Sequence, residues 1–180
     1  MRINAPIKKI NLLILGSVLF MGTQVFAKAN PNVPERIKKF AGELKGELVA
    51  AMKSGGPVKA VDVCSKRAVE LAKKHSDARV TLGRSSDRLR NPANKPPTWM
   101  VESLESFKKS KSKKPVTLTL KDGSSAFLKP IYIDAPCLVC HGEKVAKPVQ
   151  DILSKHYPDD KARSYKLGDF RGVFWAVTKK

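Results

Sequence analysis

The chain has 180 residues, which is enough for one domain or for one domain with an appendage. Its net charge is +19, from 35 lysines and arginines against 16 acidic residues, and 42% of its residues are hydrophobic. This composition excludes a polytopic membrane protein, and it argues against wholesale disorder because enough apolar residues remain for one core. So basic a chain first suggests a nucleic-acid-binding protein, but the N-terminus opposes that interpretation.

The N-terminus has the layout of a secretory signal peptide. A positive region formed by Arg2, Lys8 and Lys9 precedes the uncharged, largely apolar residues 10–26. Small or compact residues follow, so we place the cleavage after Ala27, with Ala29 as the nearest alternative. An uncleaved anchor is the competing interpretation, since the apolar run reaches only the lower limit of a membrane span.

We therefore predict a signal peptide over residues 1–27 and a single exported domain over residues 28–180. The signal peptide carries three positive charges and no acid, so its removal leaves a mature chain with a charge of +16. The predicted location is a bacterial periplasm, where chromosomal DNA is absent. We therefore expect no nucleic-acid partner.

The first part of the mature chain predicts two helices and a short strand. Apolar residues recur at steps of three and four over residues 34–53 and again over residues 58–74. The Ser54-Gly55-Gly56-Pro57 segment between them predicts the end of the first helix. Alternation over residues 79–83 predicts a strand, and the polar residues 84–97, rich in Arg, Asn and Pro, predict a loop.

The middle of the chain predicts a helix followed by a hairpin. The helix covers residues 98–109, and the alternating pattern of residues 116–121 predicts a half-buried strand. Asp122-Gly123 is a hairpin-turn signal, so residues 125–133 are expected to return as a second strand. Pro130 lies within that strand and predicts a bulge or an edge.

The last part predicts a helix over residues 145–156 and a strand over residues 172–178. This strand is apolar on both faces, which is typical of a central strand. The order of the elements, helices first and then mostly antiparallel strands with interspersed helices, predicts the α+β class.

The motif that carries chemistry is Cys137-Leu138-Val139-Cys140-His141, a C-x-x-C-H sequence. It is the attachment signature of c-type haem. Two thiols at this spacing can form thioethers with the two vinyl groups of one porphyrin, and the adjoining His141 is then held beneath the iron. We therefore predict one covalently attached haem c, bound through Cys137, Cys140 and His141, and predicted export agrees with this.

Two other interpretations of the cysteines remain open. Cys137 and Cys140 could form a small disulfide loop or a dithiol redox site, although the βαβ context of thioredoxin-like motifs is missing. Cys64, Cys137, Cys140 and a histidine could instead form a Cys₃His zinc site.

The sixth ligand of a haem iron is open on sequence physics alone. Met100 would give the ligation of ordinary cytochromes c, but methionine in an amphipathic helix usually fills a core. Cys64 lies on an apolar stripe, where a lone cysteine is usually structural. The candidates in the mature chain are Met52, Cys64, His75, Met100 and His156.

Three blocks of sequence resemble a known bacterial family. They are residues 83–94, residues 137–142, and Tyr157-Pro158 followed by residues 168–172. In this order they are similar to single-haem c-type domains with a PAS-like fold, which occur as free exported proteins and as sensor domains of signalling proteins. The resemblance spans roughly residues 34–179.

The resemblance implies a ligand set and a fold. In that family a cysteine in an early helix is the second axial ligand, and the matching position here is Cys64. The resemblance thus implies a haem iron held by His141 and Cys64. It also implies a PAS-like antiparallel sheet with N-terminal helices.

The polar loop supplies candidates for binding the haem propionates, which need cationic or hydrogen-bonding partners. These candidates are Arg84, Arg88 and Arg90, with Asn91 and Tyr132 behind them. The competing interpretation is a solvated basic surface. For Asp169 and Arg171, at the entry to the last strand, a structural role in the turn is expected.

Two functions compete at this point. A thiolate ligand would stabilise ferric iron, and its loss on reduction would open a site for CO or NO, so the first is a redox or gas sensor. The second is an electron-transfer cytochrome that docks on an acidic protein or an anionic membrane surface. We expect no enzyme, because both axial positions would be filled and no distal His/Arg pair stands out.

Overall fold

The computed structural model describes residues 32–180. The predicted signal peptide, residues 1–27, lies outside the described residues. Within residues 32–180, no helix is long and apolar enough to cross a membrane.

The first helix, α1 (Val33–Asp62), begins with a side-chain cap. The Asn32 carboxamide oxygen accepts the backbone N–H of Glu35 at 3.2 Å, and proline occupies the first turn, where its missing N–H costs no hydrogen bond. The helix is broken at Gly56, whose φ of 68° favours glycine, and Pro57 follows. The predicted stop at residues 54–57 is therefore a kink between two helical halves.

The second half of α1 continues into a π-helical turn, η1 (Val63–Arg67), and then into α2 (Ala68–His75). The predicted second helix, over residues 58–74, corresponds to these three segments together. The sequence did not predict the π-helical turn, which contains Cys64. Such single turns insert one extra residue into a helix and are frequent at functional sites.

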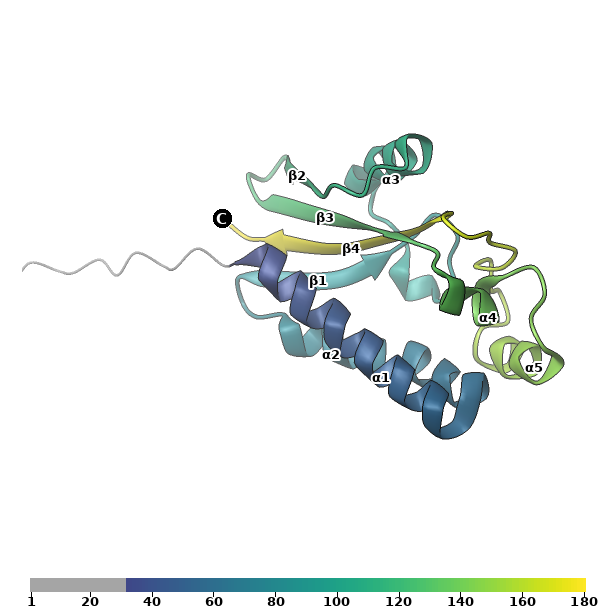
Figure 1. Ribbon diagram of the computed structural model, residues 1–180. Helices are drawn as coiled ribbons and strands as arrows, with labels where there is room; N and C mark the ends of the chain where they lie inside the picture. The colour runs from purple at the N-terminus through teal and green to yellow at the C-terminus, as the bar shows by residue number, and fades with distance from the viewer. Residues whose placement is uncertain (1–31) are drawn as a thin grey trace, which may run out of the picture. The chain divides into compact units, whose positions relative to one another are not determined.

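The sheet contains four strands in the order β1-β4-β3-β2, and all neighbours are antiparallel. The strands are β1 (Val80–Ser85), β2 (Val116–Thr119), β3 (Ser125–Tyr132) and β4 (Phe170–Thr178). The α+β class is confirmed, and so is the central position of the last strand (Figure 1). One boundary was wrong: Arg84 was expected in a loop, but it pairs with Phe174 and belongs to β1.

A β-bulge interrupts the pairing of β3 with β4. Ile131 pairs with Gly172 and Tyr132 with Phe170, so Arg171 is the extra residue without a partner. Gly172 has a φ of 148°, and a Cβ atom there would lie 2.2 Å from the Ser85 carbonyl oxygen. Pro130 lies two residues before the bulge in a part of β3 that β2 does not reach, in agreement with its prediction.

Helices cover both faces of the sheet (Figure 1). On one face, α1 and α2 bury Ile37, Phe40 and Leu71 against the sheet. On the other face, α3 (Thr98–Ser110) buries its own apolar stripe of Met100, Leu104 and Phe107. Burial of these apolar side chains is the main stabilising contribution to the domain.

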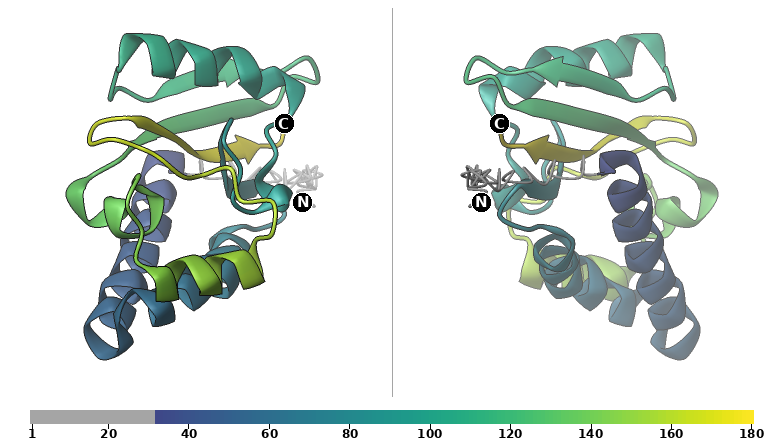
Figure 2. Two further views of the ribbon diagram at one scale, coloured as in Figure 1. Left: turned by 90° about the vertical axis from the view of Figure 1, so that its right-hand side faces the viewer. Right: turned by 90° about the vertical axis from the view of Figure 1, so that its left-hand side faces the viewer.

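The cysteine motif comes after the sheet strand β3. This strand leads through a short 3₁₀ turn, η3 (Ala135–Cys137), into α4 (Leu138–His141), and a further helix, α5 (Lys147–His156), comes next. Helix α5 packs against the C-terminal end of α1, where Val61 joins a cluster with Val149 and Leu153 (Figure 2). This contact brings the end of α1, and with it the π-helical turn, to the same part of the domain as the motif.

Candidate functional site

The motif forms two consecutive tight turns. The Asp134 carboxylate accepts the Ala135 backbone N–H at 2.9 Å and starts the 3₁₀ turn that ends at Cys137. Gly142 ends α4, and a Cβ atom there would lie 2.6 Å from the Leu138 carbonyl oxygen. The glycine after the histidine is therefore required by the tight packing of the last turn on the first.

His141 is oriented by a hydrogen bond from its ring. Its Nδ1 lies 2.8 Å from the Ala162 carbonyl oxygen, which can only accept, so Nδ1 carries the proton. Burial lowers the pKa of His141 to about 2, and the nearby Arg90 and Arg171 add to the effect. The imidazole is thus neutral, with the lone pair of Nε2 available to a metal, in the arrangement common for ligating histidines.

The π-helical turn places Cys64 close to the motif. Burial raises the pKa of the Cys140 thiol, Arg90 opposes this, and Cys64 and Cys137 raise it further. The three sulfur-bearing side chains therefore interact electrostatically, although Cys64 is far from the others in sequence. All three cysteines are free and half-buried.

The alternatives for the cysteines have little support. None of the three forms a disulfide. Within residues 32–180, no group of three or more His, Cys, Asp and Glu side chains is arranged to hold a metal ion, so the Cys₃His zinc interpretation is not supported.

The other candidates for a sixth ligand have roles elsewhere. Met100 is fully buried in the core between α3 and the sheet. The Nε2 atom of His75 lies 2.7 Å from the Glu43 carboxylate, and that of His156 lies 3.6 Å from the Asp62 carboxylate. Met52 is half-buried in α1. Of the five candidates, Cys64 is the one found among the electrostatic neighbours of the motif cysteine.

Arg90 is a buried side chain that supports the motif through hydrogen bonds. It is only 7% exposed and forms an ion pair with the fully buried Asp160 carboxylate at 3.1 Å. Its guanidinium also donates to the carbonyl oxygens of Cys140 at 2.5 Å and Ala162 at 3.2 Å. The same loop carbonyl at Ala162 accepts from His141, so Arg90 fixes both the helix and the acceptor that orients its histidine.

Arg88 is also engaged by the protein. Its guanidinium donates to the carbonyl oxygens of Lys161 and Arg163 and stacks on Tyr165, 3.9 Å from the ring centroid. Arg88 and Arg90, two of the arginines predicted to bind the propionates, therefore have partners within the protein.

Arg84 and Arg171 differ from the other two arginines. Both are half-buried, and burial lowers the pKa of both guanidinium groups. For Arg84 the opposing influences are Cys64 and Tyr157. Arg171 donates to the Arg88 carbonyl oxygen at 3.4 Å. Sequence reasoning treated Arg171 as a turn residue. The glycine directly after it, in an otherwise apolar strand, was the signal of a bulge.

The remaining predicted residues have structural roles. The Asn91 carboxamide caps a 3₁₀ turn, η2 (Pro92–Asn94), by accepting the Ala93 N–H at 2.9 Å. The Tyr132 hydroxyl lies 3.0 Å from the Phe107 carbonyl oxygen and 2.8 Å from that of Ser112, which anchors the end of α3. Asp169 accepts the Lys166 N–H at 2.7 Å within the turn before β4.

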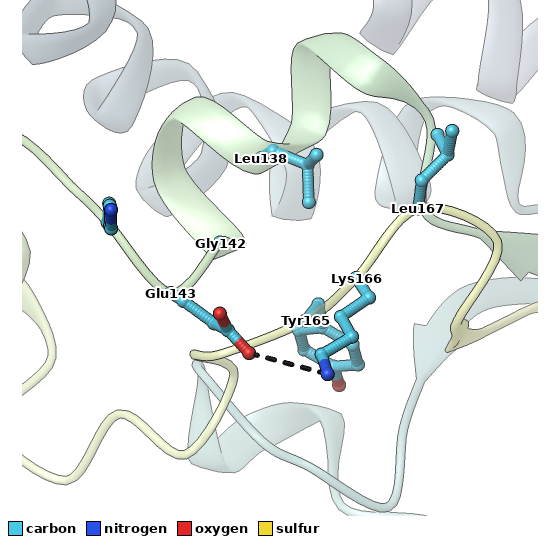
Figure 3. A pocket seen from close by; sticks show the side chains of 7 residues that line it. Leu138, Gly142, Glu143, Tyr165, Lys166 and Leu167 are labelled. Atoms are coloured by element: carbon cyan, nitrogen blue, oxygen red, sulfur yellow. Dashed lines mark ion pairs between the residues drawn. The ribbon is translucent and has the colours of Figure 1, made fainter.

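A shallow cavity of about 360 Å³ lies beside α4 (Figure 3). Its polar rim contains Glu143 and Lys166, whose charged groups are 3.8 Å apart. The lining is Leu138, Gly142, Glu143, Lys144, Tyr165, Lys166 and Leu167. None of the motif cysteines, His141 or Cys64 lines it, so we assign it no part in the site.

The donor set fits a haem. His141 offers a neutral imidazole whose proton is fixed on Nδ1. The site also offers the two motif thiols of Cys137 and Cys140 and the separate thiol of Cys64. Two half-buried guanidinium groups, Arg84 and Arg171, form no ion pair with a carboxylate among the described residues, although Asp160 favours the charged form of Arg171. The Tyr165 hydroxyl is buried without a hydrogen-bond partner in this part of the chain. Such unpaired donors call for an anionic ligand.

Comparison with known proteins bears on this site. The Tll0287-like family matches residues 17–177. A solved structure described as the cyanobacterial heme-protein Tll0287 is similar to this chain with a TM-score of 0.63 and 25% sequence identity. The similarity covers 84% of this chain and 96% of that one. No curated protein sequence matches the chain.

The matched region includes every residue of the candidate site, from Cys64 in η1 to Arg171 in the bulge. The similar structure has the same overall fold over nearly its whole length. The chain therefore belongs to the Tll0287-like family.

Proposed function

We propose that this chain is a haem protein with one c-type haem, attached through Cys137 and Cys140 and ligated by His141. The observation that carries the proposal is the 2.8 Å hydrogen bond from His141 Nδ1 to the Ala162 carbonyl oxygen, which leaves Nε2 free for iron. Membership of a family with a solved haem protein supports it. The PAS-like character of the sheet and the predicted export to the periplasm are parts of the same proposal.

Cys64 is the proposed second axial ligand. Its electrostatic influence on Cys140 and Arg84 supports this assignment, because both of those residues belong to the proposed haem site. A bound haem would supply a one-electron redox couple, and a thiolate ligand favours the ferric state.

A redox or small-gas sensor is the role that the site supports best. Cys64 lies in a π-helical turn, an irregularity of the kind that is frequent at functional sites. Loss of the Cys64 sulfur from iron would free this turn to move, and α1 and α2 adjoin it on either side. A change at the ligand would thus reach the helical layer, where a partner could detect it.

Electron transfer is the alternative, and a specific observation favours it. Val139, within the motif, is 38% exposed, and Leu167, which lines a cavity with Glu143, Lys144 and Lys166, is 65% exposed. Exposed apolar side chains on a strongly basic chain are suited to an acidic redox protein. An anionic membrane surface is the other partner that the basic chain would attract. In neither role is the protein an enzyme.

The first test is optical spectroscopy of the purified protein in both oxidation states. Covalent haem that survives acid–acetone extraction is expected, together with a thiolate-ligated ferric spectrum. Cys64→Ala should remove the thiolate signature and leave the haem attached. Ser65→Ala is the matched control, because it alters the same turn without removing the sulfur. An unchanged ferric spectrum in Cys64→Ala would overturn the ligand assignment.

A second test separates the two roles. The reduced protein is exposed to CO and, separately, mixed with a small soluble electron carrier. Rapid CO binding with displacement of Cys64 is expected for a sensor. A reduced form that keeps both ligands under CO and exchanges electrons quickly would favour the electron-transfer role instead.

A further inference from the structure

The β-bulge in β4 places a second cation beside the site. In a regular strand, alternate side chains point to opposite faces, so one extra residue reverses the faces to which the later side chains point. Arg171 is that extra residue, and Gly172 permits it by adopting a φ of 148°. As a result, Arg171 interacts electrostatically with both Arg84 of β1 and His141 of α4.

The arginines of this region divide into two kinds. Arg90 and Arg163 share the buried Asp160 carboxylate, at 3.1 Å each. The Arg84 guanidinium has no hydrogen bond or ion pair with any described residue. The Arg171 guanidinium donates one long hydrogen bond, to the Arg88 carbonyl oxygen, and has Asp160 only as an electrostatic neighbour. Partial burial of a cation without an ion-pair partner is costly. Arg84 and Arg171 are both half-buried and repel each other, which adds to this cost.

Both cations lie around the proposed haem ligands. Arg84 is an electrostatic neighbour of Cys64, and both Arg84 and Arg171 act on His141. Each of the two cations is therefore an electrostatic neighbour of at least one proposed axial ligand. A haem carries two propionate carboxylates, which would neutralise two guanidinium groups.

We infer that Arg84 and Arg171 bind the two haem propionates, one carboxylate each. This rests on the proposed function, and it deepens that proposal by assigning the propionate partners to β1 and to the bulge of β4. Arg88 and Arg90, the other arginines of this region, keep the roles that the protein gives them. The two positive charges of these guanidinium groups then match the two negative charges of the haem propionates.

The Tyr165 hydroxyl supports the same conclusion. It is the one buried side-chain polar atom without a partner among residues 32–180, and Arg171 lies near it, 5.7 Å from its ring centroid. The His141 ring packs edge-on to the Tyr165 ring, with centroids 6.1 Å apart. An unsatisfied donor is thus found near both Arg171 and the proposed ligand His141.

The test compares charge-removing variants in the haem-loaded protein. Arg84→Gln and Arg171→Gln are each expected to lower the midpoint potential, because loss of a nearby cation favours ferric iron. Each should also shift the carboxylate bands of one propionate in the redox-difference infrared spectrum. Lys161→Gln is the matched control: an exposed lysine in the same region, expected to change neither property.

Two readouts are needed because a cation can act through space. A lower potential with unchanged carboxylate bands would mean that the arginines contact no propionate, and the inference would be overturned. Arg84→Lys and Arg171→Lys serve if the glutamine variants fail to accumulate. A lysine keeps the positive charge but lacks the planar guanidinium that can bind a carboxylate with two hydrogen bonds. The carboxylate bands should therefore shift, while the midpoint potential changes less than in the glutamine variants.

The outcome also separates this inference from the proposed function. A wild-type protein without covalent haem would overturn both. A wild-type protein with haem ligated by His141 and Cys64, whose carboxylate bands are unchanged in all four arginine variants, would overturn the inference alone.

Discussion

The position of His141 depends on a small number of side chains outside the motif. The Ala162 carbonyl oxygen fixes its proton, and Arg90 holds that carbonyl together with the Cys140 carbonyl. Asp160 in turn holds Arg90, with its own side chain fully buried. A charged pair below the surface therefore sets the orientation of the imidazole, which is the kind of indirect support that ligating histidines commonly have.

Arg90→Met should destabilise the protein strongly. It leaves the buried Asp160 carboxylate with only Arg163 as a charge partner, and loss of one member of a buried pair costs about 3–5 kcal/mol. Chemical unfolding measured at neutral pH checks the value. Arg163→Met is the control on the same carboxylate: its side chain is 40% exposed, so the expected loss is below about 1 kcal/mol. Equal losses in the two variants would contradict this account.

Two irregular elements place the side chains that matter most. The π-helical turn η1 contains Cys64, and the bulge in β4 contains Arg171, an electrostatic neighbour of Arg84. Each is a one-residue departure from a regular element, and such departures re-aim side chains without altering the rest of the fold.

Two glycine-to-alanine variants should change stability in opposite directions. Gly172→Ala forces a Cβ atom to within 2.2 Å of the Ser85 carbonyl oxygen at a positive φ, and such strain costs about 1–3 kcal/mol. Gly46→Ala adds a methyl group with nothing within 4 Å in the middle of α1, and should stabilise the helix by about 0.5–1 kcal/mol. Thermal unfolding of both variants checks the signs. A neutral Gly172→Ala would mean that the bulge needs no glycine.

Regular elements were predictable from the sequence, and irregular ones were not. The central place of β4 followed from residues that are apolar on both faces, because local pattern reports burial directly. Arg84 was misplaced in a loop, because its strand pairing with Phe174 is non-local. The π-helical turn could not be predicted, because one extra residue hardly changes the spacing of apolar residues that indicates a helix. Cys64 became the favoured ligand only through resemblance, since its proximity to Cys140 depends on the packing of α1 with α5.

Over the whole molecule, positive charge falls into two populations. Many of the lysines are exposed on the surface, where each is solvated at little cost. Arg84 and Arg171 are instead half-buried, and on our inference the cofactor supplies their counter-charges. The folded state of the whole domain is thereby coupled to haem binding, since a ligand that binds only the folded chain stabilises it.

The haem-free chain should be the less stable form for an electrostatic reason. Cys137→Ala/Cys140→Ala prevents attachment, and this chain is expected to be digested by a broad-specificity protease faster than the loaded protein. Adding Arg84→Gln and Arg171→Gln to the haem-free chain should slow its digestion, while the same changes speed digestion of the loaded protein. The same direction of change in both forms would contradict the coupling.

On our inference, the two cations would make a chain without haem easier to degrade than a chain that has received it. Before attachment, Arg84 and Arg171 repel each other inside the domain, so an unloaded molecule opens more often and exposes itself to proteolysis. After attachment the same two side chains hold the cofactor's carboxylates and help to keep the domain closed. A pair of arginines would thus allow the cell to remove molecules that never received their haem and to retain those that did.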